Sequence, residues 1–173
     1  MTRAVVAGAL AVAACNAVAG LFGAWLWYRP SQPPPPGPAG PAGERDVRHR
    51  ARARADGAFW VLLRVGQGSA LALAIAVGSL AATGKYSSEH LFYLYALLPL
   101  AVGFIAEQLR VTAAQAILDQ RNLADAQAVG ALPESEQVAV VAAIVRREVG
   151  VMAISALVVV FLALRAASTA HGF

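Results

Sequence analysis

The stretch VGVMAISALVVVFLAL, residues 149–164, contains no charged residue and is typical of the interior of a membrane-spanning helix. A helix needs about 20 mostly apolar residues to cross about 30 Å of hydrocarbon. We therefore predict a spanning helix over residues 149–167. A window of about 19 residues moved outward along the chain finds three more apolar stretches, residues 4–28, 58–83 and 91–106. The predicted fold class is an all-α integral membrane protein with four transmembrane helices.

The composition agrees with a membrane protein and excludes several other classes. The chain has 173 residues, of which 58% are hydrophobic and 14% are charged, whereas about a quarter of the residues in an average soluble chain are charged. A single Cys excludes a disulfide scaffold and any metal or cluster site made of several Cys. Basic residues are almost all Arg, which together with the many Ala, Gly and Val residues is typical of a GC-rich, bacterial coding sequence.

The first apolar stretch has two other interpretations. Residues 17–19 (Ala-Val-Ala) resemble a signal-peptidase site, and residues 12–15 (Val-Ala-Ala-Cys) resemble a lipoprotein acylation box. Either would require the chain to become polar soon afterwards, but it stays apolar as far as Tyr28, and only Arg3 precedes the stretch. We therefore expect a retained helix in which Cys15 is a small packing residue.

The two long connections differ in kind. Residues 29–57 begin with a Pro-rich segment that favours polyproline II and cannot bury a core, and then become Arg-rich. Residues 107–148 continue the third helix to about residue 127, break near residues 129–132, and resume at Pro133 as the first residue of a new helix. Helices three and four are therefore expected to extend into a helical hairpin. Residues 84–90 form a short loop on the other side.

The distribution of basic residues predicts the orientation. Of the 14 Lys and Arg residues, six lie in residues 29–57 and four in residues 107–148. The positive-inside rule therefore places both long connections in the cytoplasm, residues 84–90 outside, and both termini outside. Aromatic residues form two matching interfacial belts, Trp25, Trp27, Tyr28, Phe59 and Trp60 on one side and Tyr86, Phe92, Tyr93 and Tyr95 on the other.

The Arg-rich run at residues 44–55 has three interpretations. The first is contact with anionic lipid headgroups, at about 1 kcal/mol per Arg near the surface. The second is nucleic acid, which is not expected because no aromatic residue interleaves the run. The third, which we favour, is a topology determinant that holds the loop inside. The residues concerned are Arg45, Arg48, Arg50, Arg52 and Arg54.

Polar side chains gather at the predicted cytoplasmic boundary of three helices. They are Arg64, Gln67, Glu107, Gln108 and Glu148. Charges inside a membrane are costly and usually have a partner, and we expect Arg64 to pair with Glu107, with Glu148 as the competing partner. An ion or proton entry point is one interpretation. A structural pair is favoured, because transporter sites lie near the midplane, where this chain is almost entirely apolar.

Small residues recur every four positions in the first two helices. The two stripes are Ala7, Ala11, Cys15, Ala19 and Gly23, and Gly66, Ala70, Ala74, Gly78 and Ala82. Such stripes let helix backbones approach closely in lipid, so the first two helices are predicted to pack on each other or on a partner. Asn16 is the one strongly polar residue deep in the first helix, and a hydrogen bond between helices is expected for it.

No catalytic, cofactor-binding or metal-binding template fits the chain. The sequence therefore predicts a non-enzymatic scaffold or accessory subunit of a membrane complex. Its expected partners are the bilayer with its anionic lipids, and other membrane subunits or a second copy of itself. The alternative is a small oligomeric transporter or channel, lined by Asn16, Ser69, Ser79 and the Arg64/Glu107 pair.

Overall fold

A computed structural model describes residues 2–29 and 42–170 of the chain. It contains five helices, α1 (Thr2–Tyr28), α2 (Ala42–Ala82), α3 (His90–Gln120), α4 (Ala126–Gly130) and α5 (Glu134–Thr169), and no strand within those residues. All but the short α4 are long and apolar enough to cross a membrane. The predicted all-helical fold with four such helices is confirmed.

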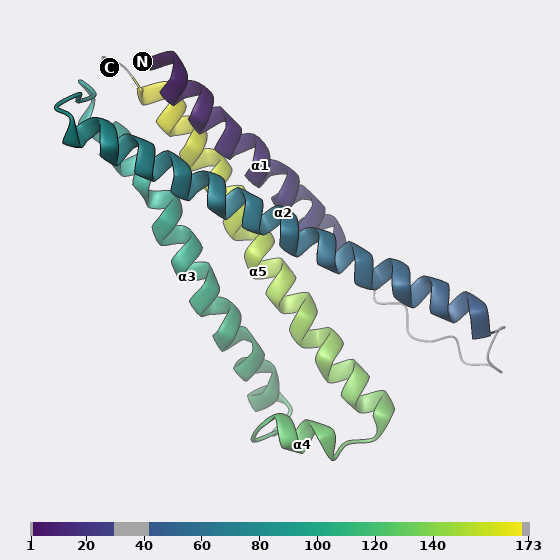
Figure 1. Ribbon diagram of the computed structural model, residues 1–173. Coiled ribbons are helices and arrows are strands. Elements are labelled where there is room, and N and C mark those ends of the chain that lie inside the picture. Colours follow the sequence, from purple (N-terminus) through teal and green to yellow (C-terminus); the bar gives the residue numbers. More distant parts are fainter. Residues whose placement is uncertain (1, 30–41, 171–173) are drawn as a thin grey trace.

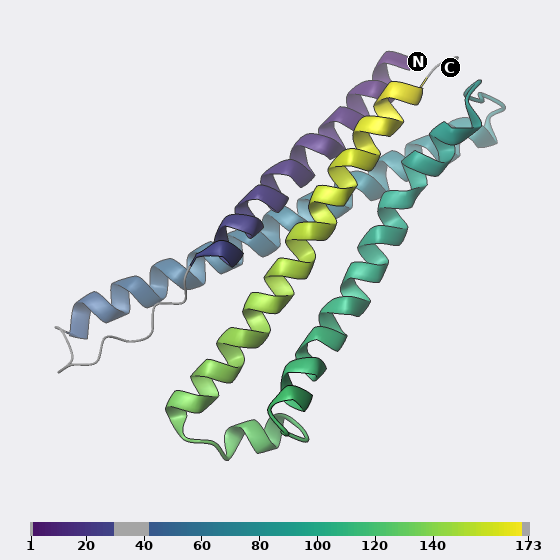
Figure 2. The ribbon, with the colours of Figure 1, turned by 180° about the vertical axis from the view of Figure 1, so that it is seen from behind.

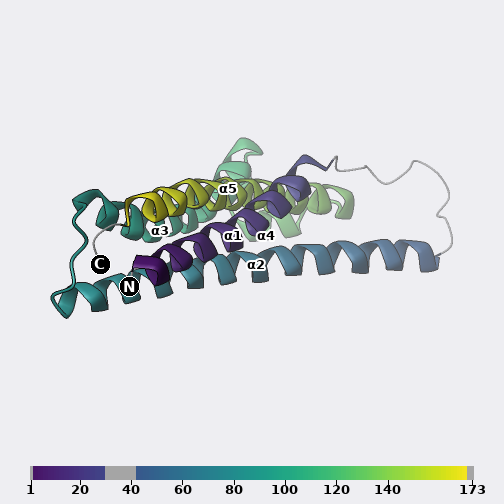
Figure 3. The same ribbon diagram turned by 90° about the horizontal axis from the view of Figure 1, so that it is seen from above.

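The four long helices form an antiparallel bundle. α1 packs between α2 and α5, and α5 packs between α1 and α3, so that α2 and α5 barely touch. Figure 3 shows α1 lying between α2 and α5 when the bundle is seen from above. The beginning of α1, the end of α5 and the turn between α2 and α3 lie at the same end of the bundle (Figures 1 and 2). At the opposite end α2 diverges from the hairpin that α3, α4 and α5 make.

Two apolar clusters fill the bundle. The first lies towards the end with the α2–α3 turn and is centred on Phe92, Val12 and Val77. The second lies farther along and is centred on Phe59, Leu63 and Met152. Large apolar side chains also cover the outside of the bundle, among them Phe161 at 72% exposure and Phe104 at 68%. A bundle embedded in a bilayer needs an apolar exterior as well as an apolar core, because its outer side chains contact lipid tails that are as apolar as the core.

The closest helix contacts involve glycine. The side chain of Asn16, only 2% exposed, donates from Nδ2 to the carbonyl of Val12 at 2.9 Å and to that of Gly66 on α2 at 3.2 Å. A Cβ on Gly66 would lie 2.8 Å from Asn16 Oδ1. Trp27 packs against Gly150 on α5 in a similar way, since a Cβ on Gly150 would lie 2.9 Å from Trp27 Nε1. The interhelical hydrogen bond expected of Asn16 is present.

The four-residue stripe predicted for α1 is only partly buried. Ala19 and Gly23 are buried as expected, whereas Ala7 and Ala11 are exposed, as are Gly78 and Ala82 on α2. The buried face of α1 instead follows a mixed three- and four-residue spacing that turns it towards both α2 and α5. Small residues on α5 make that possible, and they are Gly150, Ala153, Ala156, Ala163 and Ala166. The small residues that line this interface therefore lie on α5 as well as on α1 and α2.

The third helix ends earlier than the sequence predicted. α3 stops at Gln120, and Asn122 adopts a left-handed conformation with φ of 56°. The amide of Asn122 donates to the carbonyl of Asp119 and that of Leu123 to Leu118, which is the Schellman pattern. α4 then covers residues 129 and 130 of the predicted break, and Pro133 is the N-cap of α5 and not its first residue. Asn tolerates this conformation better than most residues, so the signal was in the sequence.

The second helix begins earlier than predicted. α2 starts at Ala42 and runs without interruption to Ala82, so the Arg-rich run at residues 44–55 is a helical extension of the second apolar stretch. Ala, Arg and Glu are strong helix formers, and nothing between them breaks the helix. The Pro-rich segment from residue 30 to residue 41 lies outside the described residues.

Candidate functional site

A polar cluster joins the middle of α2 to the middle of α3. Arg64 Nη1 lies 2.8 Å from Glu107 Oε1 and 2.6 Å from Gln67 Oε1. Gln67 Nε2 also donates to Glu107 Oε1, at 3.4 Å, so that each of the three side chains contacts the other two. Three of the five residues that the sequence singled out are therefore in contact, and the Arg64–Glu107 pair is the expected one.

The sequence analysis missed a second guanidinium in this cluster. Arg110 Nε lies 3.2 Å from Glu107 Oε2, so the two carboxylate oxygens face different Arg side chains. The Arg110 guanidinium also lies over the ring of Trp60, 5.2 Å from its centroid. The spacing could have indicated it, because Glu107 and Arg110 are three residues apart on one helix face. We refer to Arg64, Gln67, Glu107 and Arg110 as the Glu107 cluster.

The other two residues of the predicted set stay outside the cluster. Gln108 is exposed, and Glu148 is half-buried on α5. Among the residues that the structure describes, neither side chain has a hydrogen-bond or ion-pair partner. The pairing of Arg64 with Glu148, which the sequence left open, does not occur.

The predicted lipid-contact residues lie on the N-terminal extension of α2. Arg50 and Arg54 are exposed there. The side chains of the remaining members, Arg45, Arg48 and Arg52, lie outside the part of the chain whose side chains the structure describes. The backbone of this extension diverges from the hairpin of α3, α4 and α5 in Figure 1.

The Glu107 cluster is suited to holding helices together. Two guanidinium groups share one carboxylate, so the carboxylate is satisfied on both oxygens and the cluster keeps a net positive charge. Glu107 is 25% exposed, Arg110 31% and Arg64 56%. Arg64 and Arg110 occupy the two carboxylate oxygens, and no group of three or more His, Cys, Asp or Glu side chains that could hold a metal ion occurs within the described residues.

The serines named as channel-lining candidates do not join this cluster. Ser69 Oγ donates to the carbonyl of Gly66 at 2.7 Å, and Ser79 Oγ donates to that of Ile75 at 2.8 Å. Both hydroxyls are thus engaged within α2, while Asn16 bridges α1 and α2. Within one copy of the chain these groups form no continuous polar path.

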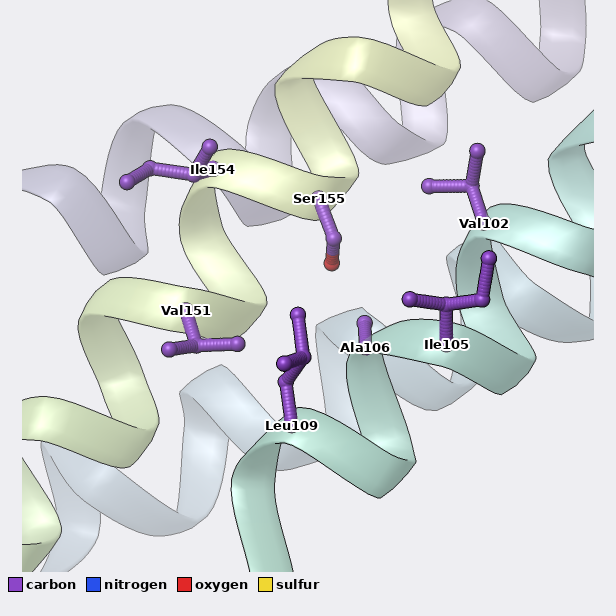
Figure 4. Close-up of a pocket in the computed structure, with 7 residues that line it drawn as sticks. All are labelled: Val102, Ile105, Ala106, Leu109, Val151, Ile154 and Ser155. Atoms are coloured by element: carbon purple, nitrogen blue, oxygen red, sulfur yellow. The ribbon is translucent and has the colours of Figure 1, made fainter. Parts of the chain in front are cut away.

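Two hollows open on the bundle surface. One of about 420 Å³ lies beside the cluster and is lined by Trp60, Val61, Arg64 and Val65 of α2. The other, of about 360 Å³, is a groove between α3 and α5 (Figure 4). The lining of the first hollow is apolar except for Arg64, and the lining of the groove is apolar except for Ser155.

Comparison with known proteins gives no relative of this chain. No protein-family model, curated protein or solved structure matches it. Its function therefore has to be inferred from the geometry alone.

Proposed function

We propose that this protein is a four-span integral membrane protein that serves as a non-catalytic scaffold or accessory subunit of a membrane complex. The observation that carries the proposal is the interior of the bundle. Among the described residues only Asn16 and Ser87 are buried polar side chains, and no buried side-chain nitrogen or oxygen lacks a hydrogen-bond partner. A transport path or a reaction centre needs polar groups free to meet a substrate, and this interior offers none.

Contacts between cations and aromatic rings support the membrane placement. Towards the hairpin, Arg29 lies 3.4 Å from the ring centroid of Trp25 and Arg110 lies 5.2 Å from that of Trp60. At the other end Arg165 lies 5.6 Å from the centroid of Tyr95. Trp, Tyr and Arg favour the two interfaces of a bilayer. On α5, Arg147 and Arg165 are 18 positions apart, about 27 Å at 1.5 Å per residue, which suits hydrocarbon about 30 Å thick.

The part of the hairpin beyond Arg110 supports a docking role. It comprises the last turns of α3, the short α4 and the first turns of α5, and it would project from the membrane. Val111, Val138 and Val141 are 66%, 63% and 53% exposed there. Apolar side chains that face neither lipid nor core are typical of a surface that another protein covers.

The orientation we propose places the hairpin and the α2 extension in the cytoplasm. Single cysteines in a Cys15→Ala background test it. Cysteine at Ser135, which is exposed on α5, should be protected from an impermeant maleimide in intact cells, whereas cysteine at Tyr86, which is 64% exposed, should be labelled. The opposite result would contradict the orientation, and protection of both sites in intact cells, with labelling of both after membrane disruption, would contradict insertion.

The function itself is tested by purification and by flux. Mild detergent extraction from its own host should yield a stable complex of fixed stoichiometry, whose subunits mass spectrometry identifies. Proteoliposomes of the purified chain should leak protons and ions no faster than empty liposomes. A monomer without partners would argue against a scaffold. Flux that Arg64→Gln abolishes would instead favour the oligomeric channel, because Arg64 is 56% exposed beside the α2 hollow.

A further inference from the structure

The groove between α3 and α5 has the dimensions and lining of a site for an alkyl chain. Its walls are Val102, Ile105, Ala106 and Leu109 from α3, and Val151, Ile154 and Ser155 from α5. Figure 4 shows the side chains of Leu109, Ala106 and Ser155 pointing into the space between the two helices. The volume of about 360 Å³ lies at the lower end of the range for small-molecule sites, about 300–1,000 Å³.

The only polar lining residue is already satisfied. Ser155 Oγ donates to the carbonyl of Met152, one turn earlier on its own helix, at 2.8 Å. The groove therefore presents methyl and methylene groups along its length. It exists because Ala106 and Ser155 are short where α3 and α5 face each other, and the longer Leu109 and Val102 stand at its two ends.

An unpaired cation lies at one end of this groove. Arg147 is four residues before Val151, so it lies on the same face of α5 one turn nearer to α4. Its side chain is exposed and has no ion-pair or aromatic partner within the described residues. Arg64 and Arg110 share Glu107, and Arg29 covers Trp25. The neighbouring Arg146 is also unpaired in the part of the chain that the structure describes, but it lies about 100° around α5 from Arg147.

We propose that this groove binds one acyl chain of an anionic phospholipid whose phosphate contacts Arg147. The proposal rests on the membrane placement above, which puts Arg147 at headgroup depth and the groove within the hydrocarbon. The unpaired charge of Arg147 beside an apolar groove fits the phosphate and acyl chain of one anionic lipid; a second copy could offer only the half-buried Glu148 of its own α5, and that dimer is one outcome of the experiment below. The chain as a whole carries a formal charge of +4, which agrees with an anionic ligand.

The preference for anionic lipid has to come from Arg147. Lipid tails surround the helices in any case, so seating a tail in the groove does not discriminate between headgroups. An Arg near the surface contributes about 1 kcal/mol towards an anionic lipid, which is about a fivefold change in the binding ratio. The groove localises one lipid, and Arg147 selects its charge.

Native mass spectrometry of the purified full-length chain with phosphatidylglycerol and phosphatidylcholine of identical acyl chains tests both parts. Arg147→Gln should lower the ratio of bound phosphatidylglycerol to phosphatidylcholine about fivefold. Arg146→Gln removes the same charge from the neighbouring position, about 100° around the helix, and should leave the ratio unchanged. Ser155→Leu, which fills the groove, should reduce binding of both lipids, and Arg147→Lys should retain the preference.

Three results would overturn the proposal. Equal effects of Arg146→Gln and Arg147→Gln would mean that diffuse charge attracts the lipid. An unchanged ratio in Arg147→Gln would mean that Arg147 selects nothing, and a dimer that Ser155→Leu dissociates would mean that a second copy fills the groove. Each variant is compared at matched helical content and melting temperature in detergent, so that misfolding is recognised. Cysteine labelling reports insertion separately, so loss of lipid preference with normal labelling leaves the membrane placement intact.

Discussion

Replacing Glu107 should destabilise the bundle more than replacing Arg64, although the two form one ion pair. Glu107 Oε1 faces Arg64 at 2.8 Å and Oε2 faces Arg110 at 3.2 Å. Glu107→Gln therefore weakens two charged contacts and leaves two guanidinium groups close together. Arg64→Gln loses one contact and leaves Glu107 paired with Arg110.

The magnitudes follow from the exposure of these groups. Ion pairs open to solvent contribute about 0.2–1 kcal/mol each, and Arg64 is 56% exposed. We expect Arg64→Gln to lower the free energy of unfolding by about 0.5 kcal/mol and Glu107→Gln by about 1 kcal/mol. The double variant should cost less than the two single losses combined, with a coupling of about 0.5 kcal/mol.

The assay is unfolding by sodium dodecyl sulfate in mixed micelles, followed by far-ultraviolet circular dichroism and Trp fluorescence. Gln108→Ala is the matched control, since Gln108 is next to Glu107 but exposed. Raising the salt concentration should shrink the difference between the wild type and Glu107→Gln, because partly exposed charges are screened. Equal losses in Arg64→Gln and Glu107→Gln, together with strict additivity, would refute the shared-carboxylate geometry.

Three further substitutions test the packing and the turns. Gly66→Ala should cost about 1–3 kcal/mol of unfolding free energy, because its Cβ would lie 2.8 Å from the α1 carboxamide oxygen, whereas Gly68→Ala, with nothing within 4 Å of its Cβ, should be neutral or stabilising in the same titration. Gly23→Ala should cost a similar amount because its Cβ would overlap the fully buried ring of Phe59; an unchanged midpoint would show that α1 does not approach α2 so closely. Asn122→Ala should cost about 1 kcal/mol and Asn122→Gly almost nothing, because φ is 56° there, and equal melting temperatures for the two variants would contradict the left-handed turn.

Much of the fold follows from local properties of the sequence. The apolar stretches around residues 4–28, 58–83, 91–106 and 149–167 appear as the four long helices, because length and hydropathy decide which segments can satisfy their backbone inside an apolar medium. The Arg64–Glu107 contact was also expected, because costly charges at a similar depth tend to find each other. Asn16 could be predicted to bond between helices for the same reason, since it is an isolated polar group in an apolar segment.

Only the tertiary structure decided which faces meet. A helix that is apolar all around carries no periodic signal for its buried side, and lipid supplies no hydrophobic drive to choose one. The stripe through Ala7 and Ala11 therefore did not predict the buried face of α1. The close packing of α1 on α5 through Gly20, where a Cβ would lie 2.8 Å from Leu157, depends on how the two helices cross. The groove between α3 and α5 likewise arises from two helices that approach each other from distant parts of the chain. Hydropathy is a property of each segment, whereas steric fit between segments exists only once they are assembled.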